Sequence, residues 1–206
     1  MSDRCGAQSF SLQSETRSCR SRGNEQDRCG PEPGGGVEAA VDHYIEHHRA
    51  RAARELEYFG RVLRSDEEAV ERAALALLPS GKRHPHQYHI PRGALEESRR
   101  CLLENLPRLR RATSFDDLYD HVDDLIRPIS GIGELTVYDT ALRIGARFGL
   151  GPTRVYLHAG TREGARALGL DARRPAIEVD ELPVAMRHLS AREVEDLLCI
   201  YKSWLG

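Results

Sequence analysis

Three histidines gather in one short stretch where acid–base or metal chemistry is conceivable. The stretch reads Lys82-Arg-His-Pro-His-Gln-Tyr-His89, so its imidazoles belong to His84, His86 and His89. Imidazole titrates near neutral pH and is a common metal ligand. A proline separates the first two histidines and no carboxylate is near in sequence, so we predict neither a metal site nor a cofactor here. We expect Lys82, Arg83 and the histidines to form a positive lip for a phosphate or carboxylate, or else a loop tucked under a helix with His86 bonded to backbone.

A glycine turn between two predicted helices is the second chemically informative feature. One helix ends near Pro128, and the next begins just after Gly131-Ile-Gly133. Glycine allows the positive φ angles that a tight reversal needs. The turn would leave amides unpaired at a helix N-terminus, where they and the helix dipole suit an anionic oxygen. The alternative is a turn that only joins two packed helices.

Two further groups of polar residues follow this turn. Asp139 stands four residues before Arg143, a spacing typical of an ion pair on a helix, although Asp139 is also a candidate acid. Further on, His158 and Glu163 flank Gly160, and such a pair could act as acid and base. Glu163 also has a purely structural interpretation, since a carboxylate in the first helical turn complements the dipole.

Helical periodicity of apolar residues dominates the chain from Val37 onward and predicts an all-α fold. Capping patterns begin helices at Ser65, Ser114 and Ser190, each followed three residues later by an acidic side chain. We expect helices over about 65–78, 92–105, 114–127, 134–148, 161–168 and 190–205, with Thr161 as a further cap and an extended segment over 155–158. The last helix carries the apolar stripe Val194, Leu197, Leu198, Tyr201 and Leu205.

Residues 1–36 differ in composition from the remainder. They are rich in Ser, Arg, Gly and Gln and end in Pro-Glu-Pro-Gly-Gly-Gly. Such a segment buries too little apolar surface to offset its chain entropy, so we predict a disordered tail over 1–36 and a single helical domain over 37–206. Three cysteines (Cys5, Cys19 and Cys29) lie in this tail, and no C-x-x-C pair supports a metal site.

The overall charge restricts the classes of partner. Thirty basic and 32 acidic residues give a net charge of -2, so attraction to nucleic acid would have to be local. The only basic run is Arg99, Arg100, Arg108, Arg110 and Arg111. Apolar runs are too short to span a bilayer, and the N-terminus has no signal-peptide pattern, so we expect no membrane association and a cytoplasmic location.

The region around the glycine turn resembles the helix-hairpin-helix DNA glycosylase superfamily. The resemblance covers roughly residues 118–170: Gly131-Ile-Gly133, then Val155-Tyr-Leu-His158, then Arg166-Ala-Leu-Gly-Leu170, in the family's order and at similar spacing. It implies a multi-helix fold and a hairpin that grips a phosphate backbone. The family's catalytic aspartate would fall at Tyr156 and the nucleophilic lysine of bifunctional members at Leu135, so the resemblance does not imply the family's usual chemistry.

Together these observations predict a nucleic-acid-binding protein related to DNA glycosylases. Its partner would be the phosphate backbone of DNA or RNA. The residues expected to contact it are Gly131, Ile132, Gly133, Arg108, Arg110, Arg111, Lys82 and Arg83.

Two alternatives stay open. One is an enzyme with a rearranged pocket formed by His86, Asp139, His158 and Glu163. The other is a protein-interaction module, binding another protein or a second copy through an apolar patch of Leu198, Tyr201 and Trp204. Aspartates crowd the helix before the turn, at positions 116, 117, 120, 123 and 124, and would repel phosphate if they faced it.

Overall fold

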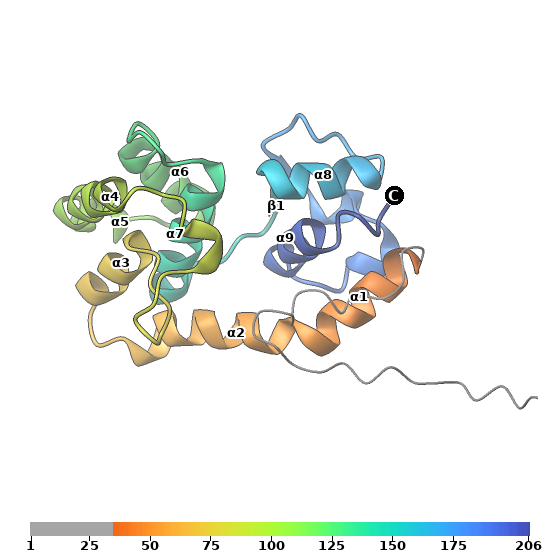
Figure 1. Cartoon of the computed structure of the whole chain (residues 1–206), viewed down its shortest axis with the longest axis horizontal. Helices are drawn as coiled ribbons and strands as arrows, with labels where there is room; N and C mark the ends of the chain where they lie inside the picture. Colours follow the sequence, from red (N-terminus) through yellow and green to blue (C-terminus); the bar gives the residue numbers. More distant parts are fainter. Residues whose placement is uncertain (1–34) are drawn as a thin grey trace, which may run out of the picture. The chain divides into compact units, whose positions relative to one another are not determined.

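The computed structural model describes residues 35–206, which are mostly helical with little sheet (Figure 1). The elements are, in order, α1 (Gly36–His47), α2 (Arg49–Glu57), η1 (Tyr58–Val62), α3 (Asp66–Ala74), η2 (Pro85–Gln87), α4 (Arg92–Glu104), α5 (Leu106–Leu109), α6 (Phe115–Ile126), α7 (Glu134–Phe148), β1 (Val155–Tyr156), α8 (Ala159–Ala167), β2 (Ala176–Ile177), η3 (Val179–Glu181), η4 (Val184–Met186) and α9 (Ala191–Ile200). The predicted disorder, apart from its last two positions, and the three tail cysteines lie outside the described residues.

Serine caps begin three helices as the sequence predicts. The Ser65 hydroxyl accepts the amide of Glu68 at 3.1 Å, and the Ser114 hydroxyl accepts the amide of Asp117 at the same distance. Ser190 caps α9, whose Glu193 carboxylate accepts the Ser190 amide in return. Each cap satisfies one backbone donor that the first turn of a helix cannot pair internally.

Three predicted helix boundaries are wrong: the last helix, α9, ends at Ile200 rather than Leu205, and two others differ for local reasons. The helix that begins at Ser65 ends at Ala74 rather than Leu78, because Ala76 takes a left-handed conformation (φ 54°). Thr161 does not cap α8. Its hydroxyl accepts the amide of His158 at 2.7 Å, and this bond makes His158 the N-cap. The predicted extended segment forms β1, which pairs antiparallel with β2.

Buried apolar side chains form two clusters. The first packs α3, α4, α6 and α7 together around residues such as Leu102, Leu118 and Ile144. The second packs α1, α8 and α9 around Tyr44, Leu197 and neighbouring side chains. Figure 1 shows α6 beside α7 and α8 beside α9. None of the helices within residues 35–206 is long and apolar enough to cross a membrane.

The second cluster absorbs the apolar stripe of α9. Leu198 is fully buried, Tyr201 is 2% exposed, and Trp204 is partly covered. The apolar patch expected of a protein-interaction module is therefore not presented by these residues. The stripe faces inward because α8 and α1 pack against it.

Candidate functional site

The predicted turn between α6 and α7 is an exposed glycine hairpin. Gly131 has φ +93°, and a Cβ there would lie 3.1 Å from the Cδ of Pro91, so glycine is required by both the backbone conformation and the close approach. Gly133 is the N-cap of α7 with an ordinary φ of -103°. Ile132 between them is 6% exposed and joins the first core cluster, which anchors the turn.

The N-terminus of α7 offers free hydrogen-bond donors beside this hairpin. Gly133 provides no side-chain cap, so the first amides of a 15-residue helix lack an acceptor. Thr136, in the same turn, is only 7% exposed. Unpaired amides, the helix dipole and a buried hydroxyl together suit an anionic oxygen.

A cavity of about 240 Å³ lies against these donors, and we call it the hairpin hollow. Its walls are His86, Gln87, His89, Gly131, Gly133, Glu134, Leu135, Thr136 and Ala159. The structure thus brings the histidine-rich loop and the glycine turn, which are separate motifs in the sequence, to one place. No aspartate of the preceding helix is among the lining residues.

His86 is held by a buried carboxylate from α7. Its Nε2 lies 2.8 Å from Asp139 Oδ2, and Gln87 Nε2 donates to the same oxygen at 2.8 Å. The bond to Asp139 raises the pKa of His86 above its usual value. Burial by itself would raise the pKa of Asp139, but Arg143 and His86 outweigh burial and lower it. Both shifts favour an imidazolium beside a carboxylate.

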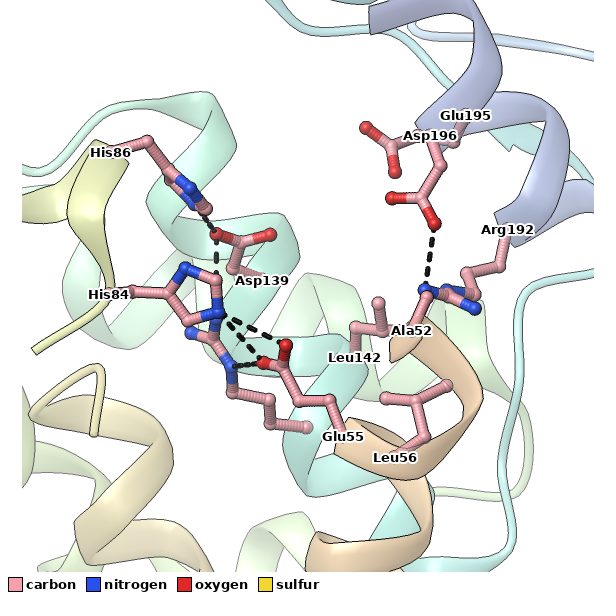
Figure 2. A pocket seen from close by; sticks show the side chains of 11 residues that line it. Ala52, Glu55, Leu56, His84, His86, Asp139, Leu142, Arg192, Glu195 and Asp196 are labelled. Carbon is pink, nitrogen blue, oxygen red and sulfur yellow. Dashed lines mark hydrogen bonds and ion pairs between the residues drawn. The ribbon is translucent and has the colours of Figure 1, made fainter. Parts of the chain in front are cut away.

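Behind His86 lies a second cavity of about 90 Å³, here called the charged pocket (Figure 2). Its lining residues are Ala52, Glu55, Leu56, His84, His86, Asp139, Leu142, Arg143, Arg192, Glu195 and Asp196. His86 and Asp139 line one side of it, and Figure 2 shows Glu195 and Asp196 approaching from α9 on the other. His86 belongs to both cavities, so they adjoin.

Glu55 is the most strongly ionised group of the charged pocket. Arg143 Nε lies 3.0 Å from Glu55 Oε1, and His84 Nε2 lies 3.1 Å from Oε2. Burial opposes ionisation, but these partners lower the pKa of Glu55 to about 2. The predicted helical pair of Arg143 with Asp139 is long, at 3.9 Å, because the guanidinium is drawn to Glu55 instead.

Carboxylates on α9 have the opposite character. Glu195 is 5% exposed, and one of its oxygens contacts His158 Nε2; burial outweighs that contact and raises the pKa of Glu195 to about 7. Asp196 accepts the Tyr44 hydroxyl at 2.9 Å and Arg192 at 2.7 Å, yet burial also raises its pKa. The pocket therefore combines carboxylates that resist protonation with carboxylates that favour it.

Several residues that the sequence singled out lie elsewhere. Glu163 is exposed and pairs with Lys202 at 2.5 Å, so it does not join His86 and Asp139. His158 is buried and reaches the charged pocket only through Glu195. Of the four residues in the predicted enzyme pocket, only His86 and Asp139 line one cavity together.

The predicted basic face is largely neutralised by acidic neighbours. Arg108 pairs with Asp124 at 2.7 Å, and Arg110 pairs with Asp66 at 2.8 Å and with Glu67. Arg83 donates to the Ile90 carbonyl at 3.0 Å, while Lys82 and Arg111 are exposed. None of Arg108, Arg110, Arg111, Lys82 and Arg83 lines the hairpin hollow. The run was misleading because α5 and its flanks pack beside acidic helix ends.

Tyr156, where the family resemblance predicts the glycosylase aspartate, lies in a structural environment. It is 6% exposed and sits in an aromatic cluster with Phe115 and Tyr138 at centroid distances of 5.5 and 5.7 Å. Its hydroxyl donates to Asp116. The ring of Tyr156 therefore packs in the core and its hydroxyl binds the Asp116 carboxylate, and Tyr156 lines neither cavity.

Glu55, Gln87, Arg192, Glu195 and Asp196 line a cavity but were not predicted from the sequence. A signal existed for Glu195, which falls on the buried face of α9 next to Val194 and one turn before Leu198. A carboxylate on an apolar helical face is unusual unless it has a partner. Nothing comparable marks Glu55, since α2 has no buried residue.

Comparison of the chain with known proteins identifies no relative. No protein-family model, curated protein or solved structure matches the chain. Among residues 35–206, no group of three or more His, Cys, Asp or Glu side chains could hold a metal ion.

Proposed function

We propose that this protein binds a nucleic-acid strand by its sugar–phosphate backbone, through the hairpin between α6 and α7. One observation carries the proposal: an exposed glycine turn leaves the first amides of α7 uncapped against a cavity of about 240 Å³. Two or more convergent amides at a helix N-terminus are a general way to hold a phosphate oxygen. The resemblance to the helix-hairpin-helix motif of DNA glycosylases points to the same partner.

Charges around the hairpin hollow support an anionic ligand. His86 carries a raised pKa, and His89 adds a second imidazole. The one carboxylate among the lining residues, Glu134, faces Arg127 at 3.7 Å and Arg162 at 3.4 Å. The local balance therefore differs from the net charge of -2 of the whole chain.

Substitution at Gly133 provides a test that leaves the fold intact. A Cβ there meets nothing within 4 Å, and both Asp and Asn are good N-caps, so Gly133→Asp and Gly133→Asn should each fold. Only the aspartate places a negative charge against the phosphate. We expect Gly133→Asp to weaken oligonucleotide binding by about tenfold or more, the equivalent of roughly 1.4 kcal/mol.

The measurement is a titration of fluorescent 20-nucleotide single and double strands at several salt concentrations. Wild-type affinity should fall with salt, by a logarithmic slope of about -1 to -3 for a few phosphate contacts. Gly133→Asn should weaken binding less than Gly133→Asp does, because both side chains cap the α7 amides and only the aspartate adds a negative charge. Salt-independent binding, or equal affinity of the two variants, would contradict the proposal.

An acid–base enzyme is the second candidate, and the contact between His86 and Asp139 favours it. A buried carboxylate that fixes an imidazole at the edge of a cavity is a recurring way to prepare a proton donor or acceptor. Of the predicted enzyme pocket, this pair remains, while Glu163 is replaced by Glu195 on the far side of the charged pocket. Perturbed pKa values of both signs in one pocket are typical of functional sites.

A further inference from the structure

The hairpin hollow contains two imidazoles as well as the donors that suit a phosphate. His86 and His89 both line it, on a loop that begins with η2. Opposite them lie Gly133 and Thr136 of the α7 N-terminus. Proton-transfer groups and phosphate-binding groups therefore face the same space.

His86 is prepared as a proton donor. Asp139 holds its Nε2, and Gln87 fixes the carboxylate by donating to the same oxygen. The Nδ1 atom makes no hydrogen bond within residues 35–206, so it is available to a ligand. The other titratable groups around the ring are His84, with centroids 4.6 Å apart, Glu55 and Arg143. The balance of these groups favours the imidazolium.

His89 is suited to accept a proton because no side chain among the described residues binds its ring. The residue is exposed, and its ring makes no hydrogen bond or ion pair with any other part of the chain that the structure describes. Its ring can therefore accept a proton from a ligand in the hairpin hollow. Concerted acid–base catalysis needs one group that donates a proton and one that accepts it, and two histidines with different partners can divide these roles.

The donors at the α7 N-terminus suit the charge that develops when a phosphodiester is attacked. A phosphorane-like transition state carries more negative charge on its non-bridging oxygens than the starting diester does. The uncapped amides of α7 are aligned by the helix before any ligand arrives, and Thr136 lines the same cavity. Donors fixed in advance cost little reorganisation and stabilise the transition state more than the ground state.

We propose that the hairpin hollow cleaves RNA by transesterification, with His89 as general base and His86 as general acid. His89 takes the proton of a ribose 2′-hydroxyl while that oxygen forms a bond to the adjacent phosphorus. The bond from phosphorus to the 5′-oxygen breaks, its electron pair stays on that oxygen, and His86 Nδ1 supplies the proton. The products are a 2′,3′-cyclic phosphate and a 5′-hydroxyl, with no oxidant, reductant or further reactant. Asp139 acts as a positioning residue through His86.

This inference rests on the proposed binding of nucleic acid, and it names the substrate as RNA. DNA has no 2′-hydroxyl, so it would bind at the same backbone contacts and stay intact. The same holds for a strand in which every 2′-oxygen carries a methyl group. These two strands therefore separate binding from cleavage.

The experiment uses the full chain with a 5′-labelled 20-nucleotide RNA and its 2′-O-methyl counterpart. Binding is measured with the methylated strand, and cleavage is followed on RNA by gel and by mass spectrometry of the cyclic phosphate. We expect RNA to be cleaved and DNA to persist. His86→Gln and His89→Gln should each slow cleavage by about 100-fold or more, and should weaken binding of the methylated strand far less, by about tenfold at most. His188→Gln, at an exposed histidine outside the hollow, should cleave normally.

Each other outcome has one meaning. If the methylated strand binds and RNA stays intact, the inference fails and the proposed function stands. If neither strand binds, the proposed function fails and the inference falls with it. Equal cleavage by wild type and His86→Gln also overturns the inference, since the activity would then come from another source. Asp139→Asn should move the alkaline limb of the pH–rate profile to lower pH, which a purely structural role would not do.

Discussion

The imidazole of His86 and the carboxylate of Asp139 lie 2.8 Å apart, although 53 positions separate them in the chain. The contact joins the loop around η2 to α7, and it stands where the hairpin hollow meets the charged pocket. A phosphate at the hairpin would therefore lie near the imidazole of His86. Asp139 favours the charged form of that imidazole and does not itself line the hairpin hollow. This arrangement links the electrostatics of the second cavity to binding in the first.

Replacing Asp139 by asparagine should lower the pKa of His86. The hydrogen bond that His86 donates to Asp139 is the largest cause of the raised pKa, so its loss returns the pKa of the imidazole to its usual range or below. NMR titration of the ring nitrogens of His86 measures this directly. Because the folded pKa is raised, the pair stabilises the fold fully below the ordinary pKa of histidine, and the contribution is lost as pH rises through the folded value.

A matched control for this substitution is Asp124→Asn. Asp124 is exposed and pairs with Arg108, outside both cavities. The pKa of His86 should not change in that variant. An equal shift in both variants would show that general charge, and not the contact with Asp139, sets the protonation of His86.

Glu195→Gln should change how stability depends on pH. Burial raises the pKa of Glu195 from 4.5 to about 7, so between these values the folded protein holds a proton that the unfolded chain releases. The free energy of unfolding of the wild type therefore falls with rising pH over this range. Glutamine has no proton to release, so relative to wild type the variant should gain on the order of 3 kcal/mol between pH 4 and pH 8.

Urea denaturation at both pH values measures the change. Glu163→Gln is the control, because Glu163 is exposed and its pKa is lowered by Lys202 rather than raised. That variant should not gain stability relative to wild type as the pH rises. If Glu195→Gln tracked the wild type from pH 4 to pH 8, Glu195 would not be the buried, proton-retaining group described above.

Gly164→Ala should destabilise the packing of α8 on α9. A Cβ at Gly164 would lie 2.4 Å from the carbonyl oxygen of Leu198, and backbone atoms of α9 cannot rotate away. Overpacking of this kind costs about 1–3 kcal/mol or more. In contrast, Gly93→Ala in α4 meets nothing within 4 Å and should stabilise the fold by up to about 1 kcal/mol. Thermal or urea unfolding of the two variants in parallel checks both signs.

Tyr156→Asp would introduce the residue type that the family resemblance predicts at this position, and it should destabilise the protein. The position is buried among Phe115, Tyr119 and Tyr138, and the hydroxyl contacts Asp116. A carboxylate there would lose the aromatic packing and face Asp116, at a cost of about 3–5 kcal/mol. Tyr156→Phe keeps the ring and should cost only about 1–2 kcal/mol. Unfolding measurements distinguish the two, and a Tyr156→Asp variant as stable as wild type would remove this account of the position.

The sequence predicted most helices because helix formation depends on residues that are near one another in the chain. Spacing of apolar residues and the serine caps at Ser65, Ser114 and Ser190 predicted where helices form, and the structure agrees. Prediction failed at Leu78, Thr161 and Leu205: a left-handed residue and a side chain bonding backward moved the first two helix ends, and α9 stops at Ile200. The sequence also predicted the Gly131-Ile-Gly133 turn, because glycine favours the positive φ that Gly131 adopts.

Only the tertiary structure decided which charges meet. The sequence predicted that Arg108 and Arg110 bind phosphate. In the folded chain, helix packing places Asp124 against Arg108 and Asp66 against Arg110. Helix packing likewise joined His86 to Asp139 and set His158 against Glu195. Electrostatic energy depends on distance and burial, and spacing along the chain determines neither of them. The sequence therefore predicted the glycine turn beside the hairpin hollow. Only the tertiary structure determined which side chains surround that turn.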